Sequence, residues 1–82
     1  MSKKKAKKTR AQKMAEVAEG VMRDTFDGFL EGVADRAAKG DSQAEWSAFG
    51  LTDGQLETLR KMFEREGFGF TKNLTATFTI KW

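Results

Sequence analysis

The C-terminal segment GFGFTKNLTATFTIKW constrains the fold most, because its apolar and polar residues alternate from Leu74 to the end. Alternation with a period of two is typical of a β-strand that is buried on one face. A loop of only Lys72 and Asn73 would put the apolar side chains of the two strands out of phase, which a half-buried sheet does not tolerate. The three-residue loop Thr71–Asn73 brings them onto one face, and Asn73 tolerates the left-handed conformation that such a loop requires.

The predicted hairpin has one apolar face and one face of glycine, threonine and lysine. Its apolar face consists of Phe68, Phe70, Leu74, Ala76, Phe78, Ile80 and Trp82. The second strand extends beyond the first, which leaves part of its edge without a hydrogen-bonded partner. An unpaired strand edge can pair with a further strand. The segment EWSAF of the same chain, a second copy or a foreign protein could supply that strand. We therefore expect a partner-binding site at Thr79, Ile80, Lys81 and Trp82.

A long amphipathic helix is predicted from about residue 11 to residue 39. At 100° per residue, its apolar side chains gather on one face and its acidic side chains on the opposite face. The apolar face comprises Met14, Ala18, Val21, Met22, Phe26, Phe29 and Val33. Val17 is the exception, because it stands among the acids. Gly40 suits the left-handed position that ends a helix.

A second helix is predicted after Leu51, because Thr52 and Gln55 form a capping box. Its buried stripe consists of Leu56, Leu59, Met62 and Phe63, and Gly67 ends it. The preceding segment, SQAEWSAFG, is ambiguous. Trp46 and Phe49 have the spacing of a short helix, which we favour, whereas Trp46 and Ala48 alternate as in a strand.

Together these elements predict an α+β fold. It consists of a long N-terminal amphipathic helix, a short helix or strand, a second helix and a C-terminal antiparallel β-hairpin.

Charge divides the chain, because residues 1–13, MSKKKAKKTRAQK, contain seven basic residues and no acidic one. The rest of the chain holds the other eight of the 15 basic residues and all 12 acidic ones. We predict a disordered basic arm at residues 1–13 and a single small α+β domain at residues 14–82.

The basic arm is the strongest chemical signal in the sequence. A run of positive charge neutralises phosphates and releases their counterions, which gives salt-sensitive affinity that does not depend on base sequence. We therefore predict nucleic-acid contacts, with DNA and RNA both open, at Lys3, Lys4, Lys5, Lys7, Lys8, Arg10 and Lys13. Lys61, Arg65 and Lys72 are predicted as secondary contacts.

Residues 14–82 resemble winged helix-turn-helix modules. The apolar residues and turn glycine of that motif correspond to Phe49, Gly50, Leu51, Leu56 and Leu59. The resemblance implies that the helix at residues 52–66 enters the major groove of DNA. Glu45 and Trp46 depart from the pattern, because the family has an apolar residue and a small residue there. A helical pair with a β-hairpin of no particular family explains the same pattern.

The residue types argue against enzymatic chemistry. The chain has no Cys and no His, which removes thiolate nucleophiles, the usual zinc ligands and the side chain that titrates nearest neutral pH. We expect a non-enzymatic protein without cofactor or metal. No apolar run approaches the ~20 residues that span a bilayer, so we expect no membrane partner and a cytoplasmic location. The alternative function is a small phage-like interaction module that binds and modulates a larger host protein, and the chain is either a monomer or a homodimer.

Overall fold

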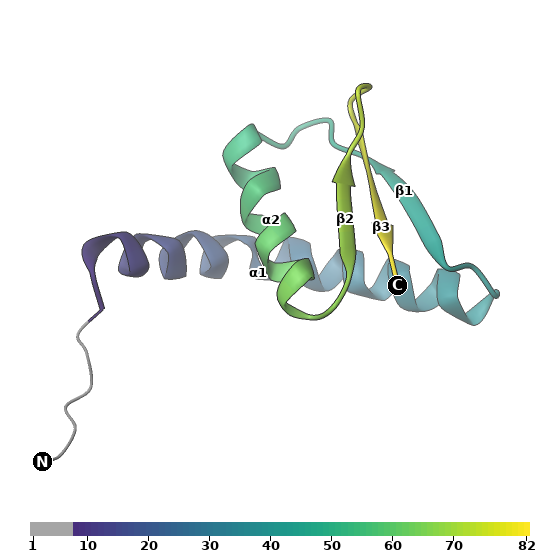
Figure 1. Cartoon of the computed structure of the whole chain (residues 1–82), viewed down its shortest axis with the longest axis horizontal. Coiled ribbons are helices and arrows are strands. Elements are labelled where there is room, and N and C mark those ends of the chain that lie inside the picture. Colours follow the sequence, from purple (N-terminus) through teal and green to yellow (C-terminus); the bar gives the residue numbers. More distant parts are fainter. Residues whose placement is uncertain (1–7) are drawn as a thin grey trace, which may run out of the picture.

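The computed structural model describes residues 8–82, and this part of the chain contains two helices and three strands. The helices are α1 (Arg10–Ala38) and α2 (Asp53–Arg65). The strands are β1 (Gln43–Ser47), β2 (Gly69–Lys72) and β3 (Thr77–Lys81), and they form one antiparallel sheet with β3 in the middle. Both helices pack on the same face of this sheet (Figure 1). The predicted α+β fold is confirmed.

Both helices begin with a capping box. At α2, the Gln55 amide N–H donates to Thr52 Oγ1 (3.1 Å) and the Thr52 N–H donates to Gln55 Oε1 (2.9 Å), as predicted. Thr9 and Gln12 make the same pair of bonds, so α1 begins at Arg10. Residues 10–13 are therefore helical, although they were assigned to the disordered arm. Residues 1–7 of that arm lie outside the described part of the chain.

The ambiguous middle segment is a strand and not the favoured short helix. β1 pairs with β3 so that Ala44 lies opposite Ile80 and Trp46 lies opposite Phe78. This register places the alternating side chains Ala44 and Trp46 on the apolar face of the sheet. The i, i+3 spacing of Trp46 and Phe49 would also fit a short helix. The segment forms a strand because pairing with β3 satisfies its backbone hydrogen-bonding groups and buries Ala44. Phe49 follows in a turn and is exposed.

The hairpin has a longer loop than predicted. Phe70 pairs with Ile80 and Lys72 pairs with Phe78, so the loop runs through residues 73–76. The shift is an even number of residues, so the apolar faces still agree, but Leu74 and Ala76 are exposed and not in the core. Trp82 is only partly covered, with 37% of its surface exposed.

Side-chain hydrogen bonds account for the longer loop. Asn73 does not take a left-handed conformation, since the positive-φ residues in the described part of the chain are glycines. Its Nδ2 donates instead to Glu45 Oε2 (2.9 Å), to Thr77 Oγ1 (3.0 Å) and to Thr79 Oγ1 (3.1 Å). These bonds tie the loop to β1 and β3 on the polar face of the sheet.

The core lies between the sheet and the two helices. Its largest fully buried side chains are Phe63, Phe78, Leu59 and Ile80. The Phe78 ring stacks on Phe70 with a centroid distance of 5.0 Å, and Phe29 of α1 meets Phe78 edge-on at 5.2 Å. Gly32 of α1 leaves room for the indole of Trp46, because a Cβ there would lie 3.1 Å from Trp46 Cζ2.

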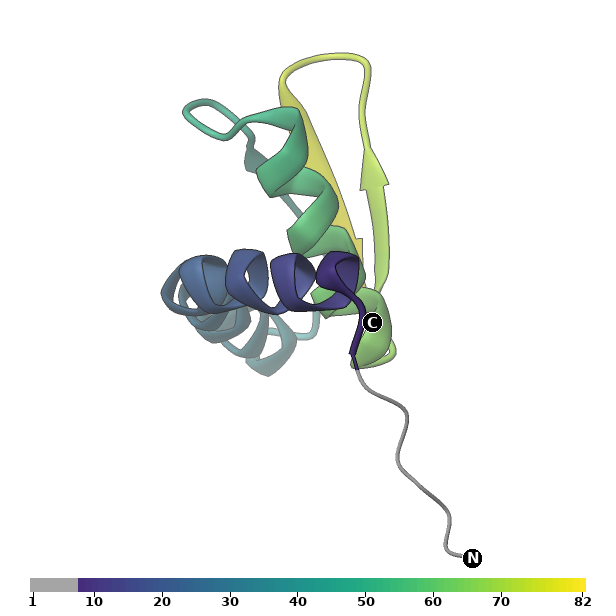
Figure 2. The same cartoon turned by 90° about the vertical axis from the view of Figure 1, so that its left-hand side faces the viewer.

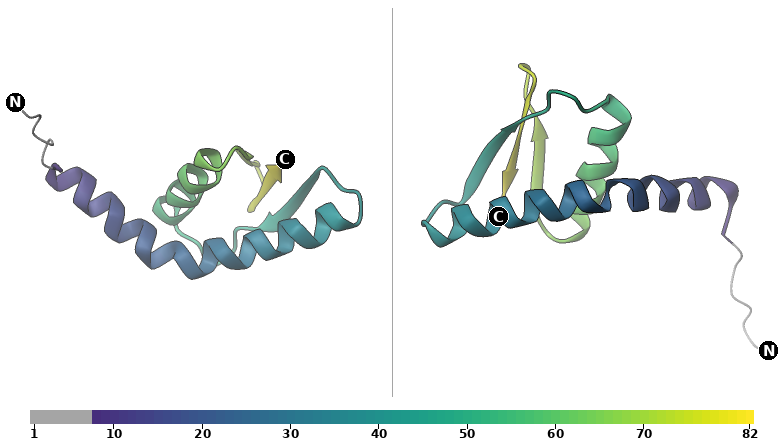
Figure 3. Two further views of the ribbon diagram at one scale, coloured as in Figure 1. Left: turned by 90° about the horizontal axis from the view of Figure 1, so that it is seen from below. Right: turned by 180° about the vertical axis from the view of Figure 1, so that it is seen from behind.

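The N-terminal part of α1 projects beyond α2 and the sheet (Figures 1 and 3). Met14, Val17 and Val21 on this projecting part are 64%, 59% and 71% exposed, and we call them the exposed stripe. Met14 and Val21 belong to the predicted apolar face of the helix, but this part of the face is not covered by the rest of the described chain. α2 runs steeply across α1 (Figure 2), and the buried α1 side chains begin at Met22.

Candidate nucleic-acid interface

The described part of the arm places its basic residues at the start of α1. Arg10 and Lys13 lie in the first helical residues, and the first turn contains no acidic side chain. Lys8 precedes the cap and forms an ion pair with Glu16. A helix N-terminus also carries partial positive charge. The basic side chains and the helix dipole therefore both favour an anion in this region. The other predicted arm residues, Lys3, Lys4, Lys5 and Lys7, lie outside the described part.

Lys61 and Arg65 lie where α2 crosses α1. The Arg65 guanidinium donates to both carboxylate oxygens of Glu19, at 2.9 and 2.7 Å. The pKa of Glu19 is lowered mainly by this hydrogen bonding and also by the positive charges of Arg65, Arg23 and Lys61. Arg23, Lys61 and Arg65 thus surround one carboxylate, and we call them the helix-crossing cluster. Arg23 was not among the predicted nucleic-acid contacts. Its position one helical turn after Glu19 could have indicated that it lies near this carboxylate.

Lys8 lies near this cluster. A cavity of about 380 Å³ between the start of α1 and the end of α2 is lined by Lys8, Gln12, Ala15, Glu16, Glu19 and Arg65. The structure therefore brings one arm residue and one predicted α2 contact to the same place. Both cations already bond to carboxylates there, so a phosphate has to share or displace those bonds.

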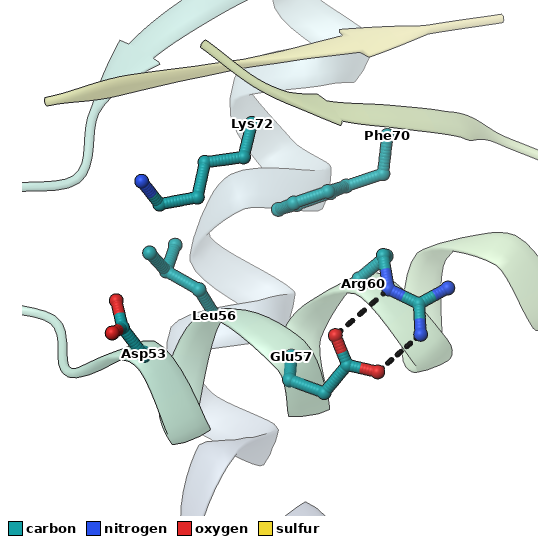
Figure 4. A pocket seen from close by; sticks show the side chains of 6 residues that line it. All are labelled: Asp53, Leu56, Glu57, Arg60, Phe70 and Lys72. Carbon is teal, nitrogen blue, oxygen red and sulfur yellow. Dashed lines mark hydrogen bonds and ion pairs between the residues drawn. The ribbon is translucent and has the colours of Figure 1, made fainter. Parts of the chain in front are cut away.

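Lys72 lies in a separate groove between α2 and β2 (Figure 4). The groove has a volume of about 340 Å³ and is lined by Asp53, Leu56, Glu57, Arg60, Phe70 and Lys72. Arg60 bonds to Glu57 and to Glu64 Oε1 (2.6 Å), and its hydrogen bonding to Glu57 raises the pKa of Arg60 and lowers that of Glu57. The groove therefore mixes both signs of charge, and the structure does not bring Lys72 together with Lys61 and Arg65.

The open strand edge expected near the C-terminus is absent from the described structure. Thr79, Ile80 and Lys81 lie in the central strand and pair with β1 on one side and β2 on the other. Trp82 continues this arrangement, since its backbone N–H donates to the Ser42 carbonyl (3.0 Å) and its Nε1 donates to the Asp41 carbonyl (3.0 Å). β1 supplies the missing strand from within the chain, which removes the reason for a partner-binding site at residues 79–82.

Comparisons of this chain with protein-family models, with curated proteins and with solved structures find no match. Among residues 8–82, no helix is long and apolar enough to cross a membrane. Within the same range, no three His, Cys, Asp or Glu residues are grouped so that they could hold a metal ion. The resemblance to winged helix-turn-helix modules stays a prediction.

Proposed function

We propose that this chain is a small non-enzymatic nucleic-acid-associated protein whose basic N-terminal arm contacts phosphates. The observation that carries the proposal is the charge division, with seven basic residues and no acidic one in residues 1–13. Several phosphates neutralised together release counterions and give substantial affinity at low salt. Lys8 lies beside the helix-crossing cluster, which supports a continuous path for a phosphate backbone from the arm onto α2.

The proposed binding is independent of base sequence. Reading a guanine edge requires a guanidinium that is free to make two hydrogen bonds to it. Arg65 makes its paired bonds to Glu19, and Arg60 makes its bonds to Glu57 and Glu64. If α2 and the β2–β3 hairpin acted as the recognition helix and wing of a winged helix, those acids would oppose the phosphates. We therefore assign affinity to the arm, secondary contacts to Lys61 and Arg65, and little to Lys72.

The proposal is tested by fluorescence polarisation with a mixed-sequence DNA duplex and an RNA of the same sequence at low salt. The variant replaces five of the six arm lysines by glutamine, namely Lys3, Lys4, Lys5, Lys7 and Lys8. We expect a loss of affinity of at least about tenfold, because each lost phosphate contact removes counterion release. The control replaces Lys39 and Lys81, which lie outside the proposed path, and should bind like the wild type. Wild-type protein that fails to bind either nucleic acid, or a variant that binds equally well, would refute the proposal.

A protein partner is the second candidate function, in the form of a phage-like module that modulates a larger host protein. One observation favours it: Phe49 and Leu74 are large apolar side chains that are almost fully exposed. Their loops lie at the same end of the sheet (Figure 1), where the Ala48 N–H donates to the Ala76 carbonyl (2.8 Å). Exposed apolar side chains on neighbouring loops are suited to contact with another protein. A complex that survives nuclease and is lost on Phe49→Ser with Leu74→Ser would support this function, whereas nuclease-sensitive material alone would count against it.

A further inference from the structure

The projecting part of α1 presents apolar surface that the rest of the described chain leaves uncovered. Met14, Val17 and Val21 have i, i+3, i+7 spacing, so they follow one side of the helix. Each is more than half exposed. Beside Val21 lies a groove of about 420 Å³, walled by Ala18 and Met22 of α1 and by Gly54 and Thr58 of α2. The exposed stripe therefore ends at a hollow of a size to receive a side chain.

Charges of opposite sign stand at the two ends of the exposed stripe. Arg10 and Lys13 precede it, and Arg23, Asp24 and Asp27 follow it. At 100° per residue, Asp24 lies nearest the line of the stripe, whereas Arg23 and Asp27 lie farther round the helix. In a single chain, both the basic pair and the acidic pair stand in electrostatically unfavourable positions. The basic pair stands at the positive end of the helix dipole, where cations are disfavoured. The two acids lie at i, i+3 on the same helix, where like charges repel, and Arg23, four residues before Asp27, offsets only part of this repulsion.

We infer that α1 pairs antiparallel with α1 of a second copy of this chain, stripe against stripe. At a rise of about 1.5 Å per residue, Arg10 lies about 11 Å before the midpoint of the stripe and Asp24 about 10 Å after it. Reversing one helix therefore brings Arg10 and Lys13 of one protomer to the level of Asp24 of its partner. The same arrangement brings Met14 of one protomer next to Val21 of the other, beside the groove. The interface is isologous, so each contact occurs twice.

Charge complementarity selects a second copy as the occupant. The helix that fits must carry an apolar stripe of the same length, with acids opposite Arg10 and a base opposite Asp24. α1 itself, read in reverse, has this order of charges. The inference does not depend on the proposed function, because a dimer forms with or without nucleic acid.

Sedimentation velocity over a concentration series tests the dimer. We expect the wild-type mass to rise from 9.2 kDa toward twice that value as the concentration increases. Val17→Ser with Val21→Ser should weaken dimerisation at least about tenfold, because apolar burial is lost on both protomers. Serine has a helix propensity close to that of valine, so α1 should persist. Leu74→Ser, which removes an even more exposed apolar side chain elsewhere, should leave the dimer unchanged.

A charge exchange tests the antiparallel order. The variant Arg10→Glu with Lys13→Glu should be monomeric alone, and so should the variant Asp24→Lys, because each places like charges together. Mixing the two variants restores opposite charges at both ends of the interface and should restore a dimer of wild-type affinity. A wild-type protein that stays monomeric at every concentration would overturn the inference. A dimer that is insensitive to the valine variant, or a mixture that stays monomeric, would also overturn it.

Discussion

Gly28 and Gly32 lie one turn apart in α1 but have different surroundings. A Cβ at Gly28 would meet no atom within 4 Å, whereas a Cβ at Gly32 would lie 3.1 Å from the indole of Trp46. Alanine in a helix interior is favoured over glycine by about 1 kcal/mol. We expect Gly28→Ala to raise the free energy of unfolding by about that amount, and Gly32→Ala to gain less or to lose stability. Urea denaturation measures both. An equal gain for the two variants would show that Trp46 does not pack on Gly32.

The Glu19–Arg65 pair joins the two helices and makes stability depend on pH. The pKa of Glu19 is lowered from its usual 4.5, chiefly because Arg65 donates hydrogen bonds to it. A carboxylate of this kind stabilises the fold above its unfolded-state pKa, and its contribution is lost as the pH falls through the folded-state pKa. Because Arg65 is largely exposed and water screens the pair, we expect Glu19→Gln to cost only about 0.5 to 1 kcal/mol near neutral pH.

Urea denaturation over a pH series checks this expectation. The difference between the wild type and Glu19→Gln should shrink as the pH falls below 4.5. Glu16→Gln serves as the control, because Glu16 is more exposed than Glu19 and pairs with Lys8, which lies just before α1, so its effect should be smaller. A difference that stays constant with pH would contradict the role assigned to the Glu19–Arg65 pair.

At the scale of elements, local signals predicted some parts of the fold and failed at others. α2 was predicted well because Thr52, Gln55 and Gly67 mark its ends within a few residues. β1 was not favoured because its short pattern suits a helix equally, and only pairing with β3 decides between them. The same pairing closes the edge of β3, and β1 is one of the three strands that the sequence left open for that position.

The hairpin loop and the exposed stripe were missed because tertiary contacts determine them. The loop length depends on a hydrogen bond from Asn73 to Glu45, two residues that are far apart in the sequence. The exposure of Met14 and Val21 depends on where α2 crosses α1. The candidate site was predictable only in part. Charge alone pointed to Lys61 and Arg65, but their grouping with Arg23 around Glu19 required the crossing of the helices.

The two capping boxes should differ in their effect on stability, because α2 lies in the core and the start of α1 does not. Thr52→Ala should lower the free energy of unfolding by about 1 kcal/mol, since it removes the cap of a helix that buries Leu59 and Phe63. Thr9→Ala should fray the projecting part of α1, with a small loss of helical circular dichroism and little effect on global unfolding. An equal loss of global stability would show that the start of α1 is part of the cooperative unit.

At the scale of the whole molecule, positive charge concentrates at one end of a chain whose remaining residues are net acidic. An antiparallel pair of α1 helices places the two arms at opposite ends of the dimer. Two arms that reach the same nucleic acid would bind with higher apparent affinity than one. The valine variant of the exposed stripe should then bind more weakly to long nucleic acids than the wild type, while its affinity for a short oligonucleotide stays the same.

The most direct test of the central claim is the salt dependence of nucleic-acid binding by the full chain. If the arm neutralises phosphates, the logarithm of the binding constant should fall linearly with the logarithm of salt concentration. Each arm lysine replaced by glutamine should reduce the slope by up to about one unit. The wild type should show a steep slope, and the variant that lacks Lys3, Lys4, Lys5, Lys7 and Lys8 a shallow one. Binding that does not change with salt, or a slope that the lysine replacements leave unaltered, would contradict the account.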